Sequence, residues 1–489
     1  MTAIPQLTHT NLWQNRCYIG GQWVAAVGDN TLEVVNPANG EALAQVPLLT
    51  QKQANAALVA AEQAFDDWRA RSPNERGALL RRWYELMLKH KDDLATIMTL
   101  EQGKPWAESN AEIQYAAAFI DWFAEEAKRG FGDVIPATKP HQQLLAIPEP
   151  VGVSVAITPW NFPAAMITRK AGAALAAGCS MVVKPSALTP LSALALAVLA
   201  QEAGIPDGVF NVITGKSADI GEVFTQSTIV KKLSFTGSTE VGRHLMAQCA
   251  PNLQKLSLEL GGNAPFIVFA DADLDLAVQG VIAAKFRNSG QTCISPNRFL
   301  VEVSVQAEFV QRLTKALADL KVGDGLEEGV QVCSLINDKA LDKVRRHYDD
   351  ALAQGARCEM GQRPGSLANN RIAPIVLTQA NEHMQFWQEE TFGPLVAIKA
   401  FNTEEQALAL ANDTHYGLAS YFYTASASRV VRVSRALQAG MVGVNEGAIS
   451  NAMAPFGGID QSGFGREGGR QGMREYQSLK YICQSIDNG

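Results

Sequence analysis

Residues 151–185 of the chain read VGVSVAITPWNFPAAMITRKAGAALAAGCSMVVKP. The stretch begins with a β-rich apolar run at 151–157 and continues through an alanine-rich helical segment at 163–177. It closes with a second short apolar run at 181–185. Short apolar strands that alternate with helices are typical of a parallel, doubly wound sheet. The pattern therefore predicts an α/β fold.

The same alternation continues toward the C-terminus, and a second α/β block begins at residue 264. Right-handed crossovers place the carboxyl ends of parallel strands at one edge of a sheet, so we expect ligands to bind at that edge. The expected strands are 209–215, 232–237, 264–269 and 298–303, and the expected helices are 191–204, 217–226, 238–250, 274–288 and 306–320.

The two ends of the chain differ from this middle part. Apolar spacing predicts helices at 51–68, 75–98 and 107–128, followed by a turn-rich stretch. The segment YQSLKYICQ at 476–484 alternates enough to form an edge strand. An unpaired edge strand is a liability unless something covers it, and a partner subunit would do so.

Composition narrows the class of protein. At ~100–200 residues per domain, 489 residues indicate two to four domains. The 49 acidic residues outnumber the 42 basic ones, which argues against a nucleic-acid partner and a polybasic membrane anchor. Seven scattered cysteines without a CxxC pair argue against a disulfide framework and a zinc site, and we expect no metal. With no membrane-spanning run and no secretory signal, we expect a soluble cytoplasmic protein.

Two glycines suggest a place for a dinucleotide. In KLSFTGSTEVG, residues 232–242, Gly237 and Gly242 fall where the first and third glycines of a dinucleotide fingerprint would lie, with Thr239 at the middle position. A tight strand-to-helix turn with Ser238 as N-cap explains the segment equally well. The motif alone leaves both interpretations open.

Two further segments hold reactive side chains. SLELGGNAP places Glu259 in an apolar strand before two glycines, where it forms either a salt bridge or part of a site. KFRNSGQTCISPNR places Cys293 on a glycine-containing loop, where a thiol is able to react. A small buried hydrophobe is the alternative, and we prefer it for Cys179 and Cys249, which lie in apolar surroundings.

The motifs ITPWNFP, FTGSTEVG, LELGG, FRNSGQTC, EETFGP and PFGG occur in this order. Together they resemble the NAD(P)-dependent aldehyde dehydrogenase superfamily over nearly the whole chain. Longer stretches, WNFPAAMITRKAGAALAAGC and FGGIDQSGFGREGG among them, are most similar to the succinate-semialdehyde dehydrogenases. The resemblance implies a Rossmann-like cofactor domain from 1–128 and 149–260, an α/β catalytic domain at 261–470, and a small β oligomerisation arm from 129–148 and 471–489. It also implies a homodimer or homotetramer.

The resemblance also assigns roles to single residues. It implies Cys293 as nucleophile, Glu259 as general base, and Asn161 as a donor to the oxyanion. Substrate-binding residues would be Arg169, Arg287 and Ser450. The implied cofactor-binding residues are Thr158, Trp160, Lys184, Ser186, Ala187, Gly237, Ser238, Leu260, Glu390 and Phe392.

The implied reaction is oxidation of succinate semialdehyde to succinate, in GABA degradation, with glutarate semialdehyde or another aliphatic aldehyde as the alternative. Relatives that prefer NAD often carry a glutamate where this chain has Ala187, so we expect NADP to be preferred and NAD to be accepted. A thiol acyltransferase without nicotinamide and an inactive homologue are the competing hypotheses. Ser295 stands where close relatives often carry a second cysteine, so a disulfide with the nucleophile is not expected there.

Overall fold

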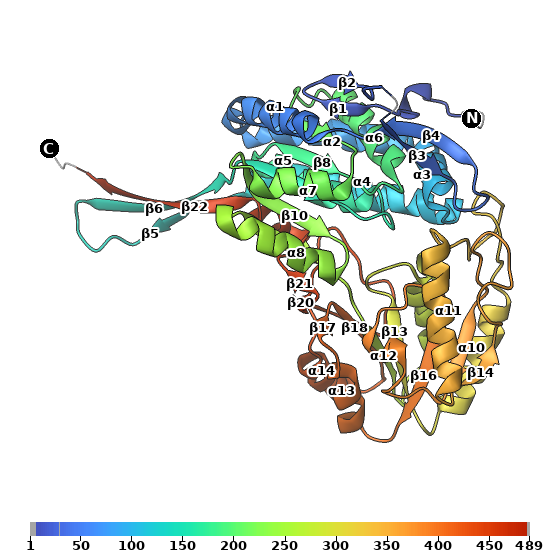
Figure 1. Ribbon diagram of the computed structural model, residues 1–489. Coiled ribbons are helices and arrows are strands. Elements are labelled where there is room, and N and C mark those ends of the chain that lie inside the picture. Colours follow the sequence, from blue (N-terminus) through green and yellow to red (C-terminus); the bar gives the residue numbers. More distant parts are fainter. Residues whose placement is uncertain (1–5, 29, 487–489) are drawn as a thin grey trace.

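The computed structural model describes residues 6–28 and 30–486. Figure 1 shows helices and strands of the N-terminal half in the upper part, coloured blue to green, and those of the C-terminal half in the lower part, yellow to orange. A thin arm that contains the last strand projects to one side. The α/β fold predicted from the sequence is confirmed. The domain limits given above stay a prediction, and their outermost residues 1–5 and 487–489 lie outside the described ranges.

The first sheet has eight strands. Five neighbouring strands of this sheet are parallel, and the outer strands on both sides are antiparallel. In spatial order the strands are β2 (Gln22–Val24), β1 (Cys17–Ile19), β9 (Phe210–Val212), β8 (Met181–Lys184), β7 (Val153–Ile157), β10 (Val230–Thr236), β11 (Lys255–Glu259) and β21 (Gly463–Phe464).

Three of the helices packed around this sheet, α1 (Gln51–Ala70), α2 (Pro73–Lys89) and α8 (Thr239–Cys249), begin at a side-chain cap. Thr50 forms a capping box with Gln53, and Ser72 forms one with Glu75 next to a proline at the first helical position. The other helices are α3 (Lys91–Gln102), α4 (Trp106–Glu126), α5 (Ala165–Ala177), α6 (Pro190–Glu202), α7 (Ser217–Gln226) and α15 (Gly469–Arg474).

Helix α5 is the centre of this half. Every one of its residues is buried, which explains its alanine-rich sequence, because small side chains let neighbouring helices approach from several sides. A Cβ added at Gly172 would lie 3.1 Å from the Phe123 ring of α4. Arg169 and Lys170 of α5 are also buried, and buried charges require partners.

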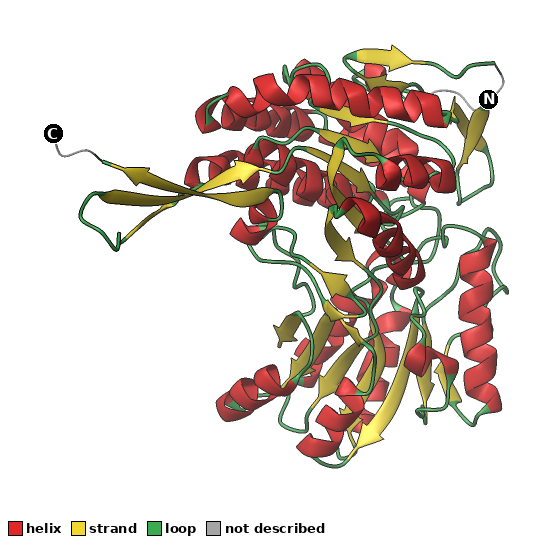
Figure 2. Cartoon of the chain, turned by 60° about the vertical axis from the view of Figure 1, so that its left-hand side comes forward, coloured by secondary structure: helices red, strands yellow, loops and turns green. Residues whose placement is uncertain are grey.

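The second sheet has seven strands, of which all but the edge strand β14 are parallel to their neighbours. In spatial order they are β14 (Arg357–Met360), β15 (Ile375–Thr378), β16 (Leu395–Phe401), β13 (Pro296–Glu302), β12 (Ala264–Val268), β18 (Ala419–Tyr423) and β19 (Met441–Val444). The accompanying helices are α9 (Leu274–Val281), α10 (Gln306–Ala318), α11 (Asp338–Ala353), α12 (Gln385–Gln388), α13 (Glu404–Asn412) and α14 (Ala427–Ala436). Figure 2 shows the two sheets one above the other with helices on their faces.

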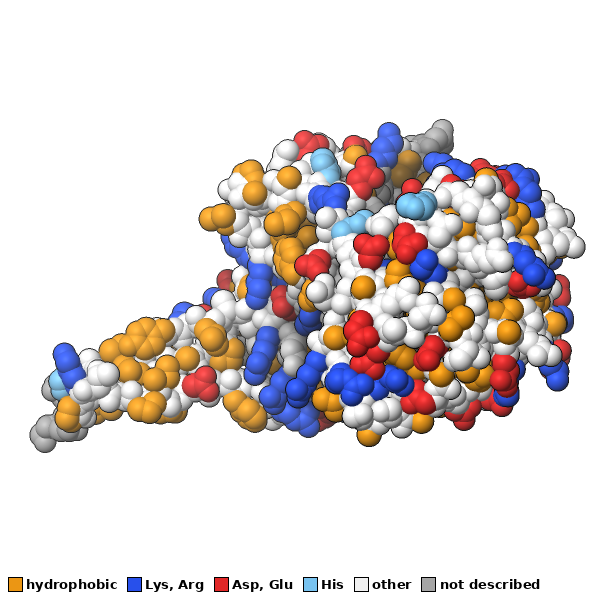
Figure 3. All heavy atoms as spheres, turned by 90° about the horizontal axis from the view of Figure 1, so that it is seen from below, with side chains coloured by type: hydrophobic (Ala, Val, Ile, Leu, Met, Phe, Trp, Pro, Cys, Tyr) orange, Lys and Arg blue, Asp and Glu red, His pale blue; other side chains and the backbone are white. Residues whose placement is uncertain are grey.

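The arm is a three-stranded antiparallel sheet in the order β22-β6-β5. Its strands are β22 (Gln477–Ser485), β6 (Gln142–Pro150) and β5 (Asp133–Ile135). The expected C-terminal strand is therefore present, and β6 of the same chain covers one of its edges along its whole length. Hydrophobic side chains gather on the projecting arm in Figure 3. Two short ribbons complete the strands: β3 (Thr31–Val35) with β4 (Ala42–Pro47), and β17 (Tyr416–Gly417) with β20 (Ile459–Asp460).

Two expected helices differ from the structure. The helix expected at 75–98 is two helices, because α2 ends and α3 begins at His90. The helix expected at 274–288 ends as an α-helix at Val281 and continues as a π-turn at 282–286 and a 3-10 turn at 287–290. Asn288 and Ser289 in that turn have the left-handed φ angles 51° and 54°, and such strain often marks functional segments.

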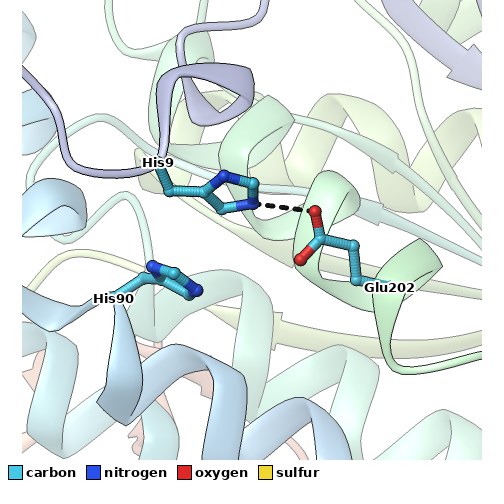
Figure 4. Close-up of side chains that lie close together, drawn as sticks. All are labelled: His9, His90 and Glu202. Atoms are coloured by element: carbon cyan, nitrogen blue, oxygen red, sulfur yellow. Dashed lines mark hydrogen bonds and ion pairs between the residues drawn. The ribbon is translucent and has the colours of Figure 1, made fainter.

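The N-terminal segment is fixed by a group of polar side chains from three elements (Figure 4). His9 hydrogen-bonds Glu202 at the end of α6 with a distance of 2.8 Å, and its ring lies 4.6 Å from that of His90. Potential ligand atoms of these three residues lie within 4.8 Å of one another. The His9–Glu202 hydrogen bond and the contact between the two imidazole rings connect the N-terminal segment to α6 and to the turn after α2.

Among the described residues, none of the helices is both long enough and apolar enough to cross a membrane.

Candidate active site

The order of the strands in the first sheet reverses at β7. From β7 the chain moves to β8 and then β9, and it returns to place β10 on the other side of β7. In open α/β sheets, ligands bind in the crevice outside the carboxyl ends of the two strands at such a point. The segment after β7 holds Trp160 and Asn161, and the segment after β10 holds Gly237 and Ser238.

A pocket of about 330 Å³ opens there. The aromatic rings of Trp160 and Phe392 form part of its lining and contact each other edge to face, with ring centroids 5.7 Å apart. Phe392 has a φ of 58°, which is a strained conformation for an aromatic residue. The lining residues are Pro159, Trp160, Asn161, Met166, Thr236, Gly237, Ser238, Leu260, Gly261, Cys293, Lys339, Ala340, Lys343, Glu390, Thr391 and Phe392.

The strand-to-helix turn after β10 serves both as a cap and as a wall of this pocket. Ser238 caps α8 by accepting a hydrogen bond from Val241 N at 3.4 Å. A Cβ added at Gly242 would lie 2.4 Å from Leu260, so this glycine allows close packing of α8 on the strand, as the third glycine of a dinucleotide fingerprint does. The free N–H groups at the start of α8 lie beside the pocket, where an anionic group is stabilised.

Cys293 reaches the pocket on the loop before β13. A Cβ added at Gly262 would lie 2.4 Å from the Cys293 carbonyl oxygen, so only glycine fits where the chain crosses between the sheets. Glu390 Oε1 accepts a hydrogen bond from Gly262 N at 3.4 Å, so this carboxylate lies beside the glycine against which Cys293 packs. Asn161 donates one of its two amide N–H groups to Gln291 O at 3.0 Å. The other N–H is available to an oxygen bound at Cys293.

The electrostatics of the site keep its thiol protonated. Burial raises the pKa of Cys293 to about 12, and Glu390 and Glu259 add to that rise, whereas Arg169 and the Cys293 backbone N–H oppose it. A free thiol has a pKa of ~8.5, so a nucleophilic cysteine needs surroundings that stabilise its thiolate. Among the protein groups alone, burial outweighs the contributions of Arg169 and the backbone N–H that lower this pKa.

Glu259 is buried without a hydrogen bond to either of its carboxylate oxygens within the described chain. Burial and the neighbouring Glu467 raise its pKa well above the usual range, while Arg169 and Lys170 lower it. Glu467 forms ion pairs with both cations, and Lys170 Nζ also donates to Thr236 Oγ1 at 2.7 Å. A carboxyl group that is unpaired, buried and easily protonated is suited to take a proton from water.

A second, narrow pocket begins at Cys293 and is lined by all three predicted substrate residues. Arg287 lies with its guanidinium 4.7 Å from the Phe162 ring centroid. Arg287 forms no ion pair with any residue that the structure describes, although Glu108 interacts with it at longer range. The lining residues are Tyr115, Phe162, Met166, Arg169, Arg287, Thr292, Cys293, Ile294, Ser450 and Phe456.

The two arginines of the second pocket differ in their partners. Arg169 is fully buried, ion-paired with Glu467, and stacked 4.3 Å above the Phe456 ring. Burial raises the pKa of Tyr115, and its neighbours Arg169, Arg287 and Ser450 oppose that rise. Arg287 is therefore the cation in this pocket that remains available for an anionic ligand.

Four predicted cofactor residues lie outside both pockets. Thr158, Lys184, Ser186 and Ala187 follow β7 and β8 along the same carboxyl edge. Lys184 Nζ donates to Ser217 Oγ at 2.7 Å, and burial lowers its pKa to about 8. The Ser186 hydroxyl accepts from Leu188 N at 3.2 Å.

Sequence reasoning missed two groups of residues around the pockets. Lys339 and Lys343 lie one turn apart on α11 and contribute two cations to the larger pocket. Their spacing places them on one face of a helix, but the sequence does not tell what that face contacts. Glu467, far along the chain, was missed because only the fold brings it to Arg169 and Lys170.

Comparison with known proteins agrees with this geometry. The family model described as "Aldehyde dehydrogenase family" matches residues 23–482. The chain belongs to the aldehyde dehydrogenase family. It is 52% identical over 478 residues to an NADP-dependent succinate-semialdehyde dehydrogenase of Escherichia coli, covering 98% of this chain and 99% of that protein.

Two further relatives of this aldehyde dehydrogenase are similarly close. A glutarate-semialdehyde dehydrogenase of Pseudomonas putida is 52% identical over 481 residues, covering 98% of this chain and 100% of that one. The crystal structure of an aldehyde dehydrogenase from Brucella melitensis biovar abortus superposes with a TM-score of 0.97 at 52% identity, covering 99% and 100% of the two chains. The family prediction and the predicted aldehyde dehydrogenase fold are confirmed.

Replacing Glu259 tests the assignment of the base. Because burial raises the pKa of this carboxyl, water activation should accelerate as pH rises through that pKa and the carboxylate forms. Glu259→Gln should retain the first-turnover burst of reduced cofactor but slow the steady state at least tenfold and remove that pH dependence. Stopped-flow absorbance across a pH series measures both phases. An unchanged steady state in Glu259→Gln, or turnover in Cys293→Ala, contradicts the assignment.

Proposed function

We propose that this enzyme oxidises succinate semialdehyde to succinate, with Cys293, Glu259 and Asn161 as the reacting groups. The Cys293 thiol releases its proton to solvent and its sulfur, as thiolate, attacks the aldehyde carbon, while the Asn161 amide and the Cys293 N–H stabilise the oxygen of the thiohemiacetal. Loss of hydride leaves a thioester on the sulfur. Glu259 takes a proton from the water that cleaves the thioester, releasing the acid and restoring the thiol.

A bound nicotinamide supplies the hydride acceptor for this reaction. The pocket at the reversal of strand order fits such a cofactor, since it combines an apolar wall with a helix N-terminus. We propose that Glu390 holds the nicotinamide ribose, that Phe392 and Leu260 pack nearby, and that Trp160, Gly237 and Ser238 lie near the pyrophosphate. We place Thr158, Lys184, Ser186 and Ala187 on the adenosine side, because they lie farther along the same edge.

The unpaired Arg287 beside Cys293 is the observation that supports a carboxylate-bearing substrate. Arginine binds carboxylates through two parallel hydrogen bonds, and an aromatic wall excludes water from that contact. We propose that Arg287 binds the carboxylate directly and that Ser450 donates a hydrogen bond to it. Arg169, which stays ion-paired with Glu467, adds positive electrostatic potential to the pocket. Both related enzymes named above are dehydrogenases of semialdehydes.

Glutarate semialdehyde is the second candidate, favoured by the Pseudomonas putida relative. One extra methylene changes binding by only ~1–3 kcal/mol, so the pocket is expected to accept both substrates at different rates.

Arg287→Ala should lower kcat/KM for succinate semialdehyde at least tenfold, because a charge-assisted partner contributes ~1.5–3 kcal/mol. The same variant should leave kcat/KM for butanal nearly unchanged, since butanal has no carboxylate. Arg169→Ala should reduce kcat/KM for both aldehydes, because it also removes an ion-pair partner of Glu467. Arg363→Ala, which removes an exposed arginine paired with Asp349, is the control. Equal losses for both aldehydes in Arg287→Ala would falsify the carboxylate pocket.

We further propose that NADP is preferred over NAD. A carboxylate at position 187 would repel a 2′-phosphate, and Ala187 offers no such repulsion. Lys184 is available to pair with the phosphate while it is protonated. Its pKa of about 8 means that the cation is present below pH 8 and is lost as pH rises above that value.

The wild-type kcat/KM should therefore be higher for NADP than for NAD at pH 7, and the ratio should fall above pH 8. Ala187→Glu should invert the ratio by introducing the repelling carboxylate. Initial rates with both cofactors at several pH values measure this, with Ala187→Gln as the uncharged control. A wild-type preference for NAD would show that Ala187 does not decide the choice.

The arm supports self-association as a homodimer or homotetramer. Phe131, Val134, Leu479 and Tyr481 are between 62% and 80% exposed on it, which forms an apolar patch on a projecting sheet. Soluble monomers rarely expose a contiguous patch of this kind, so we propose that a second copy covers it.

Leu479→Lys combined with Tyr481→Lys should shift the enzyme toward smaller species, because charges would be buried in the interface. Light scattering after size exclusion measures the mass. Leu253→Lys, at a residue 90% exposed on a turn outside the arm, is the control and should not change the mass. A wild-type protein that is monomeric at micromolar concentration would rule out the proposal.

All seven cysteines are free thiols in the described chain, which supports a reducing compartment. We propose a cytoplasmic enzyme whose reaction serves GABA degradation.

A further inference from the structure

The Asn161 segment rests on a buried ion pair from another part of the chain. Lys104, in the turn between α3 and α4, is 1% exposed, and its Nζ donates to Glu112 Oε2 at 2.5 Å. The same ammonium donates to the main-chain oxygen of Asn161 at 2.7 Å and lies 4.1 Å from the Phe162 ring centroid. One cation therefore contacts the backbone of the residue proposed to hold the oxyanion and the ring that follows it.

Glu112 connects this ion pair to α5. Its other carboxylate oxygen accepts from Ala164 N at 3.1 Å and from Ala165 N at 3.2 Å. The start of α5 has no side-chain cap from its own sequence, so Glu112 of α4 satisfies these N–H groups instead. The Lys104–Glu112 pair thus holds both ends of the short segment between Asn161 and the beginning of α5.

The nucleophile loop is attached to the same point. Asn288 Nδ2 donates to Asn161 O at 2.9 Å and to Gln291 O at 3.3 Å, while Asn288 Oδ1 accepts from Gln102 Nε2 at 3.0 Å. Asn161 Nδ2 donates to Gln291 O, two residues before Cys293. The carbonyl of Asn161 is therefore shared by Lys104 and Asn288, which links the oxyanion donor to the loop of the nucleophile.

We propose that Lys104, ion-paired with Glu112, is a positioning residue that sets the location of the Asn161 amide relative to Cys293. This inference rests on the proposed role of Asn161. Lys104 lines neither pocket, so it acts only through the Asn161 segment. Catalysis is sensitive to such positioning, since a displacement of ~1 Å at the reacting groups costs about 100-fold in rate.

The experiment is a double-mutant cycle between Lys104→Met and Asn161→Ala. Methionine keeps much of the length of lysine but loses the charge and both hydrogen bonds. Lys104→Met should lower kcat about 10- to 100-fold, while the KM values for aldehyde and NADP change little. In the Asn161→Ala background the same substitution should have almost no further effect. Glu112→Gln, which can still accept at the start of α5, should reproduce the kcat loss if Lys104→Met does not fold.

Lys128→Met removes an exposed lysine that ion-pairs with Glu125 and should behave as wild type, which controls for loss of a lysine. Urea unfolding of each variant separates stability from turnover. Two outcomes would show that Lys104 is not a positioning residue while leaving the role of Asn161 intact. In the first, Asn161→Ala lowers kcat and Lys104→Met lowers it further by the same factor as in the wild type. In the second, Lys104→Met and Glu112→Gln both keep the wild-type kcat. If Asn161→Ala itself retains full activity, both the oxyanion role and this inference are wrong.

Discussion

The site depends on a very short crossing between the two sheets. Strand β11 ends at Glu259 and strand β12 begins at Ala264, so only residues 260–263 carry the chain from one sheet to the other. The Cys293 carbonyl packs against Gly262 in this crossing, where no side chain fits. Because Glu259 lies at one end of the crossing and Cys293 packs on its middle, the distance between base and nucleophile is determined by backbone contacts rather than by flexible side chains.

Burial then sets the charge state around that crossing. The pKa values of Cys293 and Glu259 are both raised, with burial as the main cause. The permanent charges nearby are arranged differently, because Arg169 and Lys170 share the single carboxylate of Glu467 and leave an excess of positive charge beside Glu259. Removing Glu467 would leave two buried cations without a partner, which is more costly than the pairing itself is stabilising.

Local sequence patterns predicted the parallel strands β7 to β11 of the first sheet, β12 and β13 of the second, the helices up to α10 and the edge at which ligands bind, but not the helices after residue 320. They failed where the chain departs from regular periodicity. The apolar spacing at 274–288 continues past Val281, yet the helix changes to a π-turn there, and the left-handed Asn288 follows. Strain of this kind is stabilised by contacts such as Gln102 to Asn288, which join residues 186 positions apart and leave no trace in a local pattern.

The candidate site was predictable only as far as a motif carries its own chemistry. Cys293 on a glycine-containing loop and Arg287 before it were found from the sequence, and the fold brings them into one pocket. Whether an arginine is free or paired depends on distant residues, and so the difference between Arg287 and Arg169 appeared only in three dimensions.

The C-terminal segment also makes contacts with residues far away in the sequence. Strand β22 pairs with β6 across more than 300 residues, and Glu467 forms an ion pair with Lys170 of α5. During synthesis on the ribosome, the first sheet and the charge cluster on α5 therefore become complete only after residues 463–467 have emerged. Until then, Arg169 and Lys170 lack the carboxylate of Glu467, so this half of the molecule completes its packing late in synthesis.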